Sequence, residues 1–126
     1  MCIRDRHRGV QAICELAGVN AGEVHALVGP SICGRHYEVG EEVVSAFEQA
    51  GIPRAACVVA GRGARAHVDG RCAVSWQLAS AGVEVVHHMD FCTWEEPWLW
   101  SWRRQGPAAG RLAAVVAIPQ ISPVER

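Results

Sequence analysis

The chain has 126 residues, of which half are apolar and 20% charged, and its formal net charge is −1. This length suits one domain and is too short for two ordinary ones. The composition excludes a disordered tail, a collagen-like repeat and a polybasic arm, so we expect no nucleic-acid partner.

The six cysteines are spread along the chain without a C-x-x-C pair. Because the apolar content is sufficient for a core, we interpret them as small buried thiols in a reducing cytosol rather than as a disulfide framework. The sequence contains no signal peptide pattern and no apolar run long enough to span a membrane. We therefore expect a cytoplasmic protein without a membrane partner.

Residues 1–6 resemble the translation of a sequencing adapter and show no helix, strand or cap pattern. We therefore expect these six residues to be non-native. Processing scars of this kind are excluded when a fold is predicted from sequence. On this interpretation residues 7–126 form a single structural unit.

The first half of the chain predicts two helices and two strands. Apolar residues recur at i, i+3, i+4 and i+7 over residues 10–17, which predicts a helix that ends at Gly18. Residues 23–28 are a short apolar run typical of a buried strand. Helical spacing returns over residues 39–50, with acidic residues in the first turns where the helix dipole favours them. Residues 55–60 are a second candidate strand.

The second half continues the alternation. Helical spacing over residues 68–79 predicts a helix ended by Gly82, and residues 83–88 predict a strand. Trp98, Trp100 and Trp102 alternate with other residues at the period of a strand. A glycine turn at residues 106–110 precedes a final predicted strand at residues 112–118. Helices that alternate with strands indicate an α/β fold with helices packed on a mixed sheet.

Two cysteines lie where loops leave predicted strands, which is where α/β proteins commonly carry sites. Cys33 lies in the loop after the first strand, and Cys92 follows the strand at residues 83–88. A cysteine near a histidine can act as a nucleophile, so a cysteine hydrolase that uses Cys33 or Cys92 is one hypothesis. The alternative is a pair of packed thiols. A metal site made from His36, His67, His88 and Cys92 has little support, because nothing fixes their spacing.

Arginines gather near the C-terminal end, and all twelve basic residues of the chain are arginines. On a strand, the adjacent Arg103 and Arg104 face opposite sides, and Arg111 returns after the glycine turn. Arginine forms bidentate pairs with phosphate and other oxyanions, so the cluster suits an anion. The alternative is a set of surface arginines paired with nearby carboxylates.

These segments together resemble the YfiH-like family, also called the laccase-domain or polyphenol-oxidase family. Its Gly-Pro-Ala-Ile-Gly strand end and Cys-Tyr-Glu-Val-Gly helix start are similar to Gly29-Pro-Ser-Ile-Cys-Gly-Arg-His-Tyr-Glu-Val-Gly40. Further matches, in the family's order and spacing, are His67-Val-Asp69, Gln77-Leu-Ala-Ser-Ala-Gly-Val83, Cys92-Thr93, Trp100-Ser-Trp-Arg-Arg-Gln-Gly106 and Ala109-Gly-Arg-Leu-Ala113. The chain departs from the family at His36, Trp102 and Gln105, where cysteine, tyrosine and aspartate are usual.

The resemblance implies a zinc-dependent purine nucleoside phosphorylase that acts on adenosine, inosine and methylthioadenosine and also has adenosine deaminase activity. Purine nucleoside and phosphate are then the partners. Contacts to substrate or phosphate are expected from Arg103, Arg104, Arg111, Ser101 and Arg8, and no residue is assigned a catalytic role.

The family binds zinc through a histidine, a cysteine and a histidine in three motifs that precede the region matched by this chain. The resemblance therefore implies that this chain is the C-terminal part of the domain and contains none of the family's metal ligands. We expect it to be inactive alone and to bind no stoichiometric zinc. A non-catalytic interaction module is a further alternative, which exposure of Trp98 and Trp100 would favour.

Overall fold

A computed structural model describes residues 5–61 and 63–117 of the chain. It contains a two-stranded parallel sheet and a three-stranded antiparallel sheet, with helices packed beside both. The predicted α/β class with mixed strand directions is confirmed. Among the described residues, no helix is both long and apolar enough to cross a membrane.

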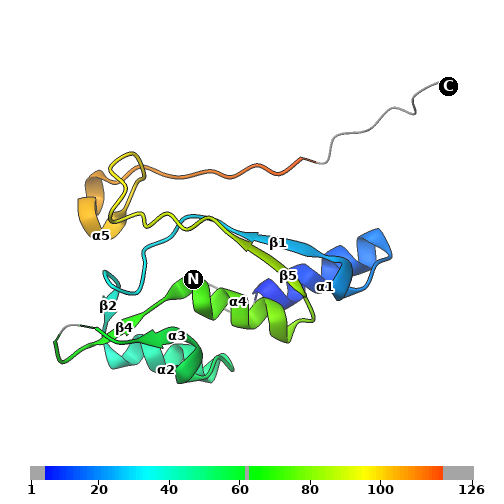
Figure 1. Ribbon diagram of the computed structural model, residues 1–126, viewed down its shortest axis with the longest axis horizontal. Coiled ribbons are helices and arrows are strands. Elements are labelled where there is room, and N and C mark those ends of the chain that lie inside the picture. Colours follow the sequence, from blue (N-terminus) through cyan, green and yellow to red (C-terminus); the bar gives the residue numbers. More distant parts are fainter. Residues whose placement is uncertain (1–4, 62, 118–126) are drawn as a thin grey trace.

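The parallel sheet pairs β1 (His25–Val28) with β5 (Val85–His88), with His25 opposite Val85. Helices α1 (Asp5–Ala17) and α4 (Gly70–Ser80) lie beside these strands, as Figure 1 shows. Their shared core contains Val10, Val28, Leu78 and Val83. Gly18 and Gly82 follow the two helices with φ of 66° and 89°, a conformation in which glycine commonly ends a helix.

The antiparallel sheet has the order β2 (Glu38–Val39), β4 (Ala66–Val68) and β3 (Val58–Val59). It packs with α2 (Glu41–Gln49) and the one-turn helix α3 (Arg54–Cys57). The core of this part is the larger one and consists of Val39, Val44, Phe47, Ile52, Cys57, Val68 and Ala73. Val44 and Phe47 bury one face of α2 in this core, and Gly51, with φ of 81°, follows the end of the helix.

Several predicted boundaries were wrong. The helix expected over residues 39–50 begins only at Glu41, because Val39 pairs in a strand with Ala66. The first half of the strand expected at residues 55–60 lies in helix α3, and only Val58–Val59 is extended and paired. Likewise Val68 belongs to β4, and Asp69 caps α4 by accepting a hydrogen bond from the Arg71 N–H at 2.9 Å. A helical period of apolar residues does not reveal where a short strand precedes the helix.

The tryptophan alternation does not form a strand. Ser101 precedes the one-turn helix α5 (Trp102–Gln105), which continues into the 3-10 turn η2 (Gly106–Ala108). The side chain of Gln105 accepts a hydrogen bond from the Ser101 N–H at 2.8 Å, which closes that turn locally. The interpretation that Arg103 and Arg104 face opposite sides of a strand was therefore wrong.

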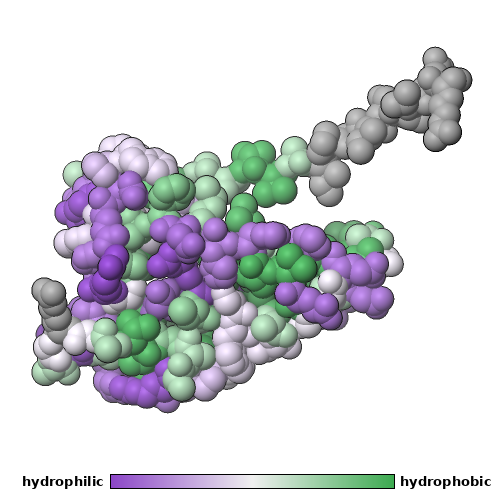
Figure 2. Space-filling model, in the orientation of Figure 1, coloured by the Kyte–Doolittle hydropathy of each residue, from purple (hydrophilic) through white to green (hydrophobic). Residues whose placement is uncertain are grey.

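The final predicted strand is also absent from the described residues, since 111–117 have no strand partner there. Val115 and Val116 are 92% and 83% exposed. Figure 2 shows this apolar stretch projecting from the main body of the molecule before the grey residues. Residue 118, the last of the predicted strand, lies outside the described residues.

The sequence predicts that the structural unit begins at residue 7. Helix α1 begins earlier, at Asp5. Arg6 lies on that helix and donates a hydrogen bond to the side chain of Gln77 at 2.9 Å. Residues 5 and 6 are thus continuous in structure with the helix that follows them.

Candidate functional site

The loops that leave β1 and β5 run side by side, because the two strands are parallel. The backbone pairing continues beyond the strands: Met89 N–H donates to Val28 O at 2.9 Å, and Thr93 N–H donates to Ser31 O at 3.1 Å. Ser31 and Cys92 form an isolated parallel bridge. Carboxyl ends of parallel strands share one edge of a sheet, and this edge therefore carries both loops.

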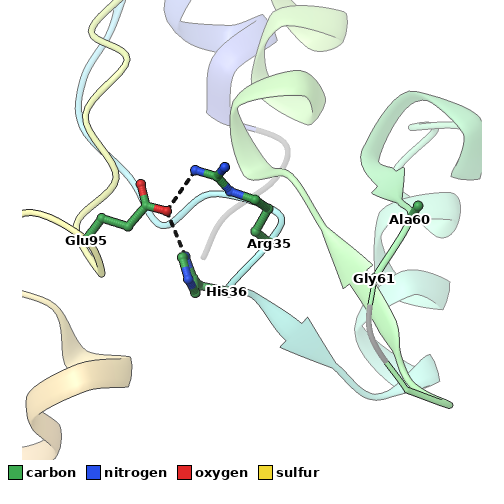
Figure 3. A pocket seen from close by; sticks show the side chains of 5 residues that line it. All are labelled: Arg35, His36, Ala60, Gly61 and Glu95. Atoms are coloured by element: carbon green, nitrogen blue, oxygen red, sulfur yellow. Dashed lines mark hydrogen bonds and ion pairs between the residues drawn. The ribbon is translucent and has the colours of Figure 1, made fainter.

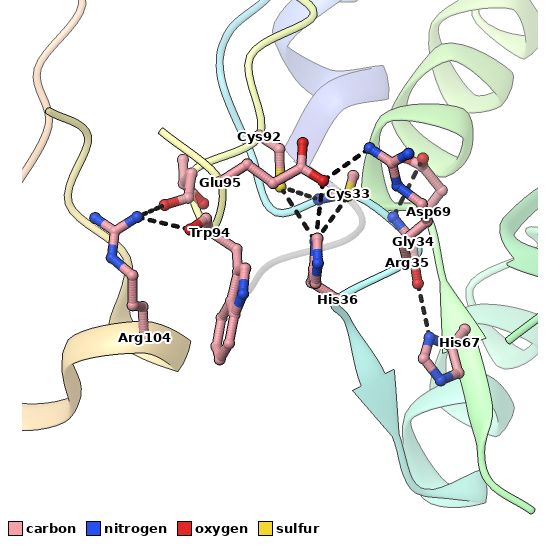
Figure 4. Close-up of polar contacts among 11 residues, drawn as sticks. Cys33, Gly34, Arg35, His36, His67, Asp69, Cys92, Trp94, Glu95 and Arg104 are labelled. Atoms are coloured by element: carbon pink, nitrogen blue, oxygen red, sulfur yellow. Dashed lines mark hydrogen bonds and ion pairs between the residues drawn. The ribbon is translucent and has the colours of Figure 1, made fainter. Parts of the chain in front are cut away.

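Four side chains of these loops form the cluster that we call the thiol cluster: Cys33, His36, Cys92 and Glu95 (Figure 4). His36 Nδ1 lies 3.3 Å from Cys33 Sγ and 3.8 Å from Cys92 Sγ. The same nitrogen is 3.6 Å from Glu95 Oε1. One potential ligand atom from each residue lies within 4.8 Å of the others. The loops thus bring together two sulfur donors, one imidazole and one carboxylate.

The two thiols differ in acidity. Burial by itself raises the pKa of Cys92, but hydrogen bonds outweigh it, chiefly from the Cys33 N–H at 3.3 Å, and lower the pKa to about 7. Burial raises the pKa of Cys33, and the adjacent Cys92 raises it further. Only 5% of Cys33 and 4% of Cys92 is exposed. This geometry supplies an acidic thiol but little access for a bulky substrate, which disfavours the cysteine hydrolase hypothesis.

Neighbouring groups fix the imidazole and the carboxylate. The ring of Trp94 stacks on His36 with centroids 5.6 Å apart and an interplanar angle of 14°. Arg35 donates to Glu95 Oε1 at 2.7 Å. A pocket of about 620 Å³ opens beside the cluster and is lined by Arg35, His36, Ala60, Gly61 and Glu95 (Figure 3). The cluster is therefore reachable from solvent through His36 and Glu95.

Gly34 lets the first loop lie against the antiparallel sheet. Its carbonyl accepts a hydrogen bond from Nδ1 of buried His67 at 2.8 Å, and its N–H lies 3.5 Å from Asp69 Oδ2. A Cβ at this position would lie 2.5 Å from Val59 Cγ2 and 3.3 Å from Asp69 Cβ. Only glycine fits this close approach.

We expect Gly34→Ala to lower the free energy of unfolding by about 1 to 2 kcal/mol, because an added methyl group overpacks the contact with Val59. Chemical denaturation followed by circular dichroism measures the change. Gly9→Ala is the matched control, since a Cβ there meets nothing within 4 Å and alanine favours a helix. A Gly34→Ala protein as stable as the wild type would contradict this account of the loop.

The predicted anion-binding residues do not come together as one group. The Arg104 guanidinium donates to four backbone carbonyls, those of Thr93, Trp94, Glu96 and Leu99, at 2.5–2.9 Å (Figure 4 draws part of this set). It holds the turn at residues 93–99 in place. The structure thus gives Arg104 a structural role.

Arg103 lies on the same helical turn, but its side chain contacts other residues than that of Arg104 does. Its guanidinium lies 4.8 Å from the centroid of the Tyr37 ring and donates to Glu38 O at 2.7 Å. Together with Ser101 it borders a pocket of about 350 Å³. The other lining residues are Ser31, Ile32, Tyr37, Phe47, Gly70, Thr93, Trp100 and Trp102. We call this the tryptophan pocket.

Arg111 and Arg8 lie elsewhere. The Arg111 side chain is exposed and donates only to its neighbouring carbonyls, Ala109 O at 3.4 Å and Gly110 O at 3.2 Å. Arg8 is an exposed residue of α1, which lies beside α4 and away from α5 (Figure 1).

Sequence reasoning named only half of the thiol cluster as possible metal ligands. It considered His36 and Cys92 together with His67 and His88, but His67 Nδ1 bonds to Gly34 O and His88 Nε2 lies 3.2 Å from Ser75 Oγ. Cys33 entered only as a candidate nucleophile, and Glu95 was missed. The available signal was two pairs at i and i+3, Cys33 with His36 and Cys92 with Glu95.

The cysteines and tryptophans outside the cluster are also informative. The five described cysteines are free thiols, and Cys72 is exposed rather than buried as predicted. Trp98, Trp100 and Trp102 are 62%, 45% and 63% exposed. Exposure of Trp98 and Trp100 favours the alternative of a non-catalytic interaction module.

The chain thus forms an α/β domain with a thiol-rich site at the ends of two parallel strands. The chain belongs to the family described as multi-copper polyphenol oxidoreductase laccase, which matches residues 6–119. This membership confirms the resemblance to the YfiH-like, laccase-domain family that the motifs indicated.

The curated relatives carry enzyme names. The chain is 37% identical over 103 residues to a purine nucleoside phosphorylase of Deinococcus radiodurans, covering 82% of this chain and 39% of that protein. It is 34% identical over 99 residues to a purine nucleoside phosphorylase of Mycobacterium tuberculosis (79% and 38%). It is 35% identical over 108 residues to an adenosine deaminase from an unknown prokaryotic organism (81% and 40%). The chain therefore spans about two fifths of the length of these relatives.

Proposed function

We propose that this chain forms part of a purine nucleoside phosphorylase and contributes the tryptophan pocket to its substrate site. The observation that carries the proposal is the similarity to enzymes named purine nucleoside phosphorylase over most of the chain. The similarity to a protein named adenosine deaminase supports a second activity, the deamination of adenosine.

The chemistry of the tryptophan pocket suits such a substrate. Aromatic rings of Trp100, Trp102 and Tyr37 offer faces for a purine base, and the hydroxyls of Ser101 and Thr93 offer partners for a sugar. Arg103 supplies a positive charge at the same pocket for phosphate. Binding sites are typically apolar clefts with a few convergent polar groups, and this pocket has that composition.

In phosphorolysis a phosphate oxygen attacks the anomeric carbon of the ribose, and the bond to the base breaks with its electron pair leaving on the base. The role proposed for Arg103 is to hold phosphate beside that carbon, because positioning contributes much of the acceleration of such a step. Arg111 is a second, more distant candidate for the anion. Arg104 and Arg8 are not proposed to bind phosphate, because Arg104 already donates to four carbonyls and Arg8 lies on α1.

Zinc supplies an activated water for deamination when it is bound. The resemblance assigns that zinc to a histidine, a cysteine and a histidine in motifs that precede the region matched by this chain. The donors of the thiol cluster have suitable chemistry for zinc or copper, but they belong to other motifs. The part proposed for this chain in either reaction is therefore confined to binding and positioning the substrates.

We expect the purified 126-residue chain to release no hypoxanthine from inosine and phosphate, because the three zinc ligands that the resemblance assigns to the family have no counterpart in it. Chromatography of the free base measures this activity. The Deinococcus radiodurans relative, assayed in parallel, is the positive control. Phosphorolysis by the isolated chain above the rate of the buffer blank would contradict this expectation.

A chimeric enzyme tests the proposed function itself. The 103 residues of this chain that match the Deinococcus radiodurans relative replace the corresponding segment of that protein, and we expect the chimera to phosphorolyse inosine. Arg103→Gln in the chimera should reduce the activity strongly, whereas Arg54→Gln, at an exposed residue paired with Glu41, should not. A folded chimera without activity would overturn the proposal.

A further inference from the structure

We propose that the thiol cluster is a zinc-binding site, built by Cys33, His36, Cys92 and Glu95, which fastens the loops after β1 and β5 to each other. The site is distinct from the metal motifs that the resemblance assigns to the family, and it does not depend on the proposed enzymatic function.

The donor set matches the preference of zinc. Zinc is bound in proteins by cysteine sulfur, histidine nitrogen and carboxylate oxygen, and structural sites use four protein ligands in a tetrahedron. The thiol cluster offers two sulfurs, one imidazole nitrogen and one carboxylate oxygen. A hard cation such as magnesium prefers oxygen ligands, so this set selects a softer metal.

The spacing of the donor atoms is already close to that of a coordination shell. Bond lengths of about 2.0–2.3 Å place neighbouring ligands of a tetrahedral zinc roughly 3.3–3.8 Å apart. The distances from His36 Nδ1 are 3.3 Å to Cys33 Sγ, 3.8 Å to Cys92 Sγ and 3.6 Å to Glu95 Oε1. Zinc would therefore bind with only small movements of the side chains.

The two loops carry the donors as two short-spaced pairs, Cys33 with His36 and Cys92 with Glu95. Short-spaced pairs on separate segments are the usual way in which zinc sites are assembled, because each turn presents two ligands to one point. The Ser31–Cys92 bridge fixes the first loop against the second, and Arg104 fixes the turn at residues 93–99. Most of the geometry is thus set without the metal.

The surroundings allow the ion to enter. Both sulfurs are buried, whereas His36 and Glu95 line the pocket of about 620 Å³ (Figure 3). Arg35 contacts Glu95 at 2.7 Å, so the carboxylate exchanges part of this ion pair for the metal. The expectation that the chain binds no stoichiometric zinc rested only on the motifs assigned to the family, and the thiol cluster changes that expectation.

A cobalt titration tests the proposal on the untagged 126-residue chain under a non-thiol reductant. Cobalt(II) is a spectroscopic substitute for zinc. We expect saturation at a single equivalent, intense visible bands of tetrahedral cobalt, and near-ultraviolet bands from thiolate to cobalt. Zinc should displace the cobalt and raise the thermal unfolding midpoint. Weak octahedral bands without thiolate absorption in the wild-type protein would overturn the proposal, whatever the variants do.

Variants locate the site. Cys33→Ser and Cys92→Ser should each remove about half of the thiolate absorption at saturation, because each leaves one of the two thiolates, and should weaken cobalt binding by more than about 100-fold, since even supporting partners of metal ligands cost 10- to 100-fold. His36→Cys should keep a tetrahedral thiolate spectrum, and Cys72→Ser, at an exposed thiol outside the site, should match the wild type. Circular dichroism confirms folding. Unchanged thiolate bands in both cysteine variants would place the metal elsewhere and contradict the assignment.

Discussion

Replacement of Arg104 by alanine should lower the free energy of unfolding by about 3 kcal/mol. Hydrogen bonds from a charged group contribute roughly 1.5–3 kcal/mol each, and the four carbonyls of the turn at residues 93–99 lose their shared donor. The sum is smaller than for four separate bonds, because three of the carbonyls share the two hydrogens of one guanidinium nitrogen, and water replaces the donor at the exposed Trp94 O. Chemical denaturation followed by circular dichroism measures the loss.

Two comparisons separate this role from a role in anion binding. Arg104→Lys should also destabilise the protein, because an ammonium group lacks the planar fork that reaches several carbonyls. Arg111→Ala, at an exposed arginine with only local contacts, should stay within about 0.5 kcal/mol of the wild type. An Arg104→Ala protein of wild-type stability that had lost phosphate binding would reverse the assignment.

Replacement of Arg103 by glutamine should weaken phosphate binding by 10- to 100-fold, on the order of a charge-assisted hydrogen bond. The side chain is held at the tryptophan pocket by the Tyr37 ring and by Glu38 O, so its charge is already positioned before phosphate arrives. Glutamine keeps a polar group of similar length but removes the charge. Isothermal titration calorimetry with inorganic phosphate measures the affinity of each protein.

The control for Arg103 is Arg54→Gln, which removes an arginine charge outside the tryptophan pocket. That variant should bind phosphate as the wild type does, and a general loss of positive charge would lower the affinity of both variants equally. Equal affinities in the wild type and Arg103→Gln would remove Arg103 from the proposed anion site. Unfolding curves of both variants confirm that neither change acts through stability.

The sequence predicted those elements that are set by local patterns. Most of α1 (Asp5–Ala17) and β5 (Val85–His88) follow from apolar periodicity and from glycine stops, which require only neighbours in the chain. The prediction of a strand at Trp98–Trp102 was wrong, because tryptophans at every second position occur in irregular turns as well as in strands. There the deciding contacts are those of Arg104 with carbonyls up to eleven residues away, which no periodicity records.

The candidate site shows the same limit. The family motifs located both loops, since Gly29 to Gly40 and Cys92-Thr93 were matched in order. Their meeting depends on the parallel register of β1 and β5, which places residues about 60 positions apart next to each other. Glu95 and Cys33 become recognisable as potential ligands of one site only when this register brings their loops together. The expectation for Cys72 was wrong for a similar reason: an apolar helical pattern does not state which face the rest of the protein covers.

The measurement that tests the proposed function of this chain most directly is a two-dimensional NMR titration of the labelled 126-residue protein with inosine in phosphate buffer. We expect saturable shift changes at the residues of the tryptophan pocket, including Thr93, Ser101 and Arg103, and a weaker response in Arg103→Gln. Saturable binding that left these residues unchanged, or no saturable change at all, would contradict the assignment of this pocket to a purine nucleoside.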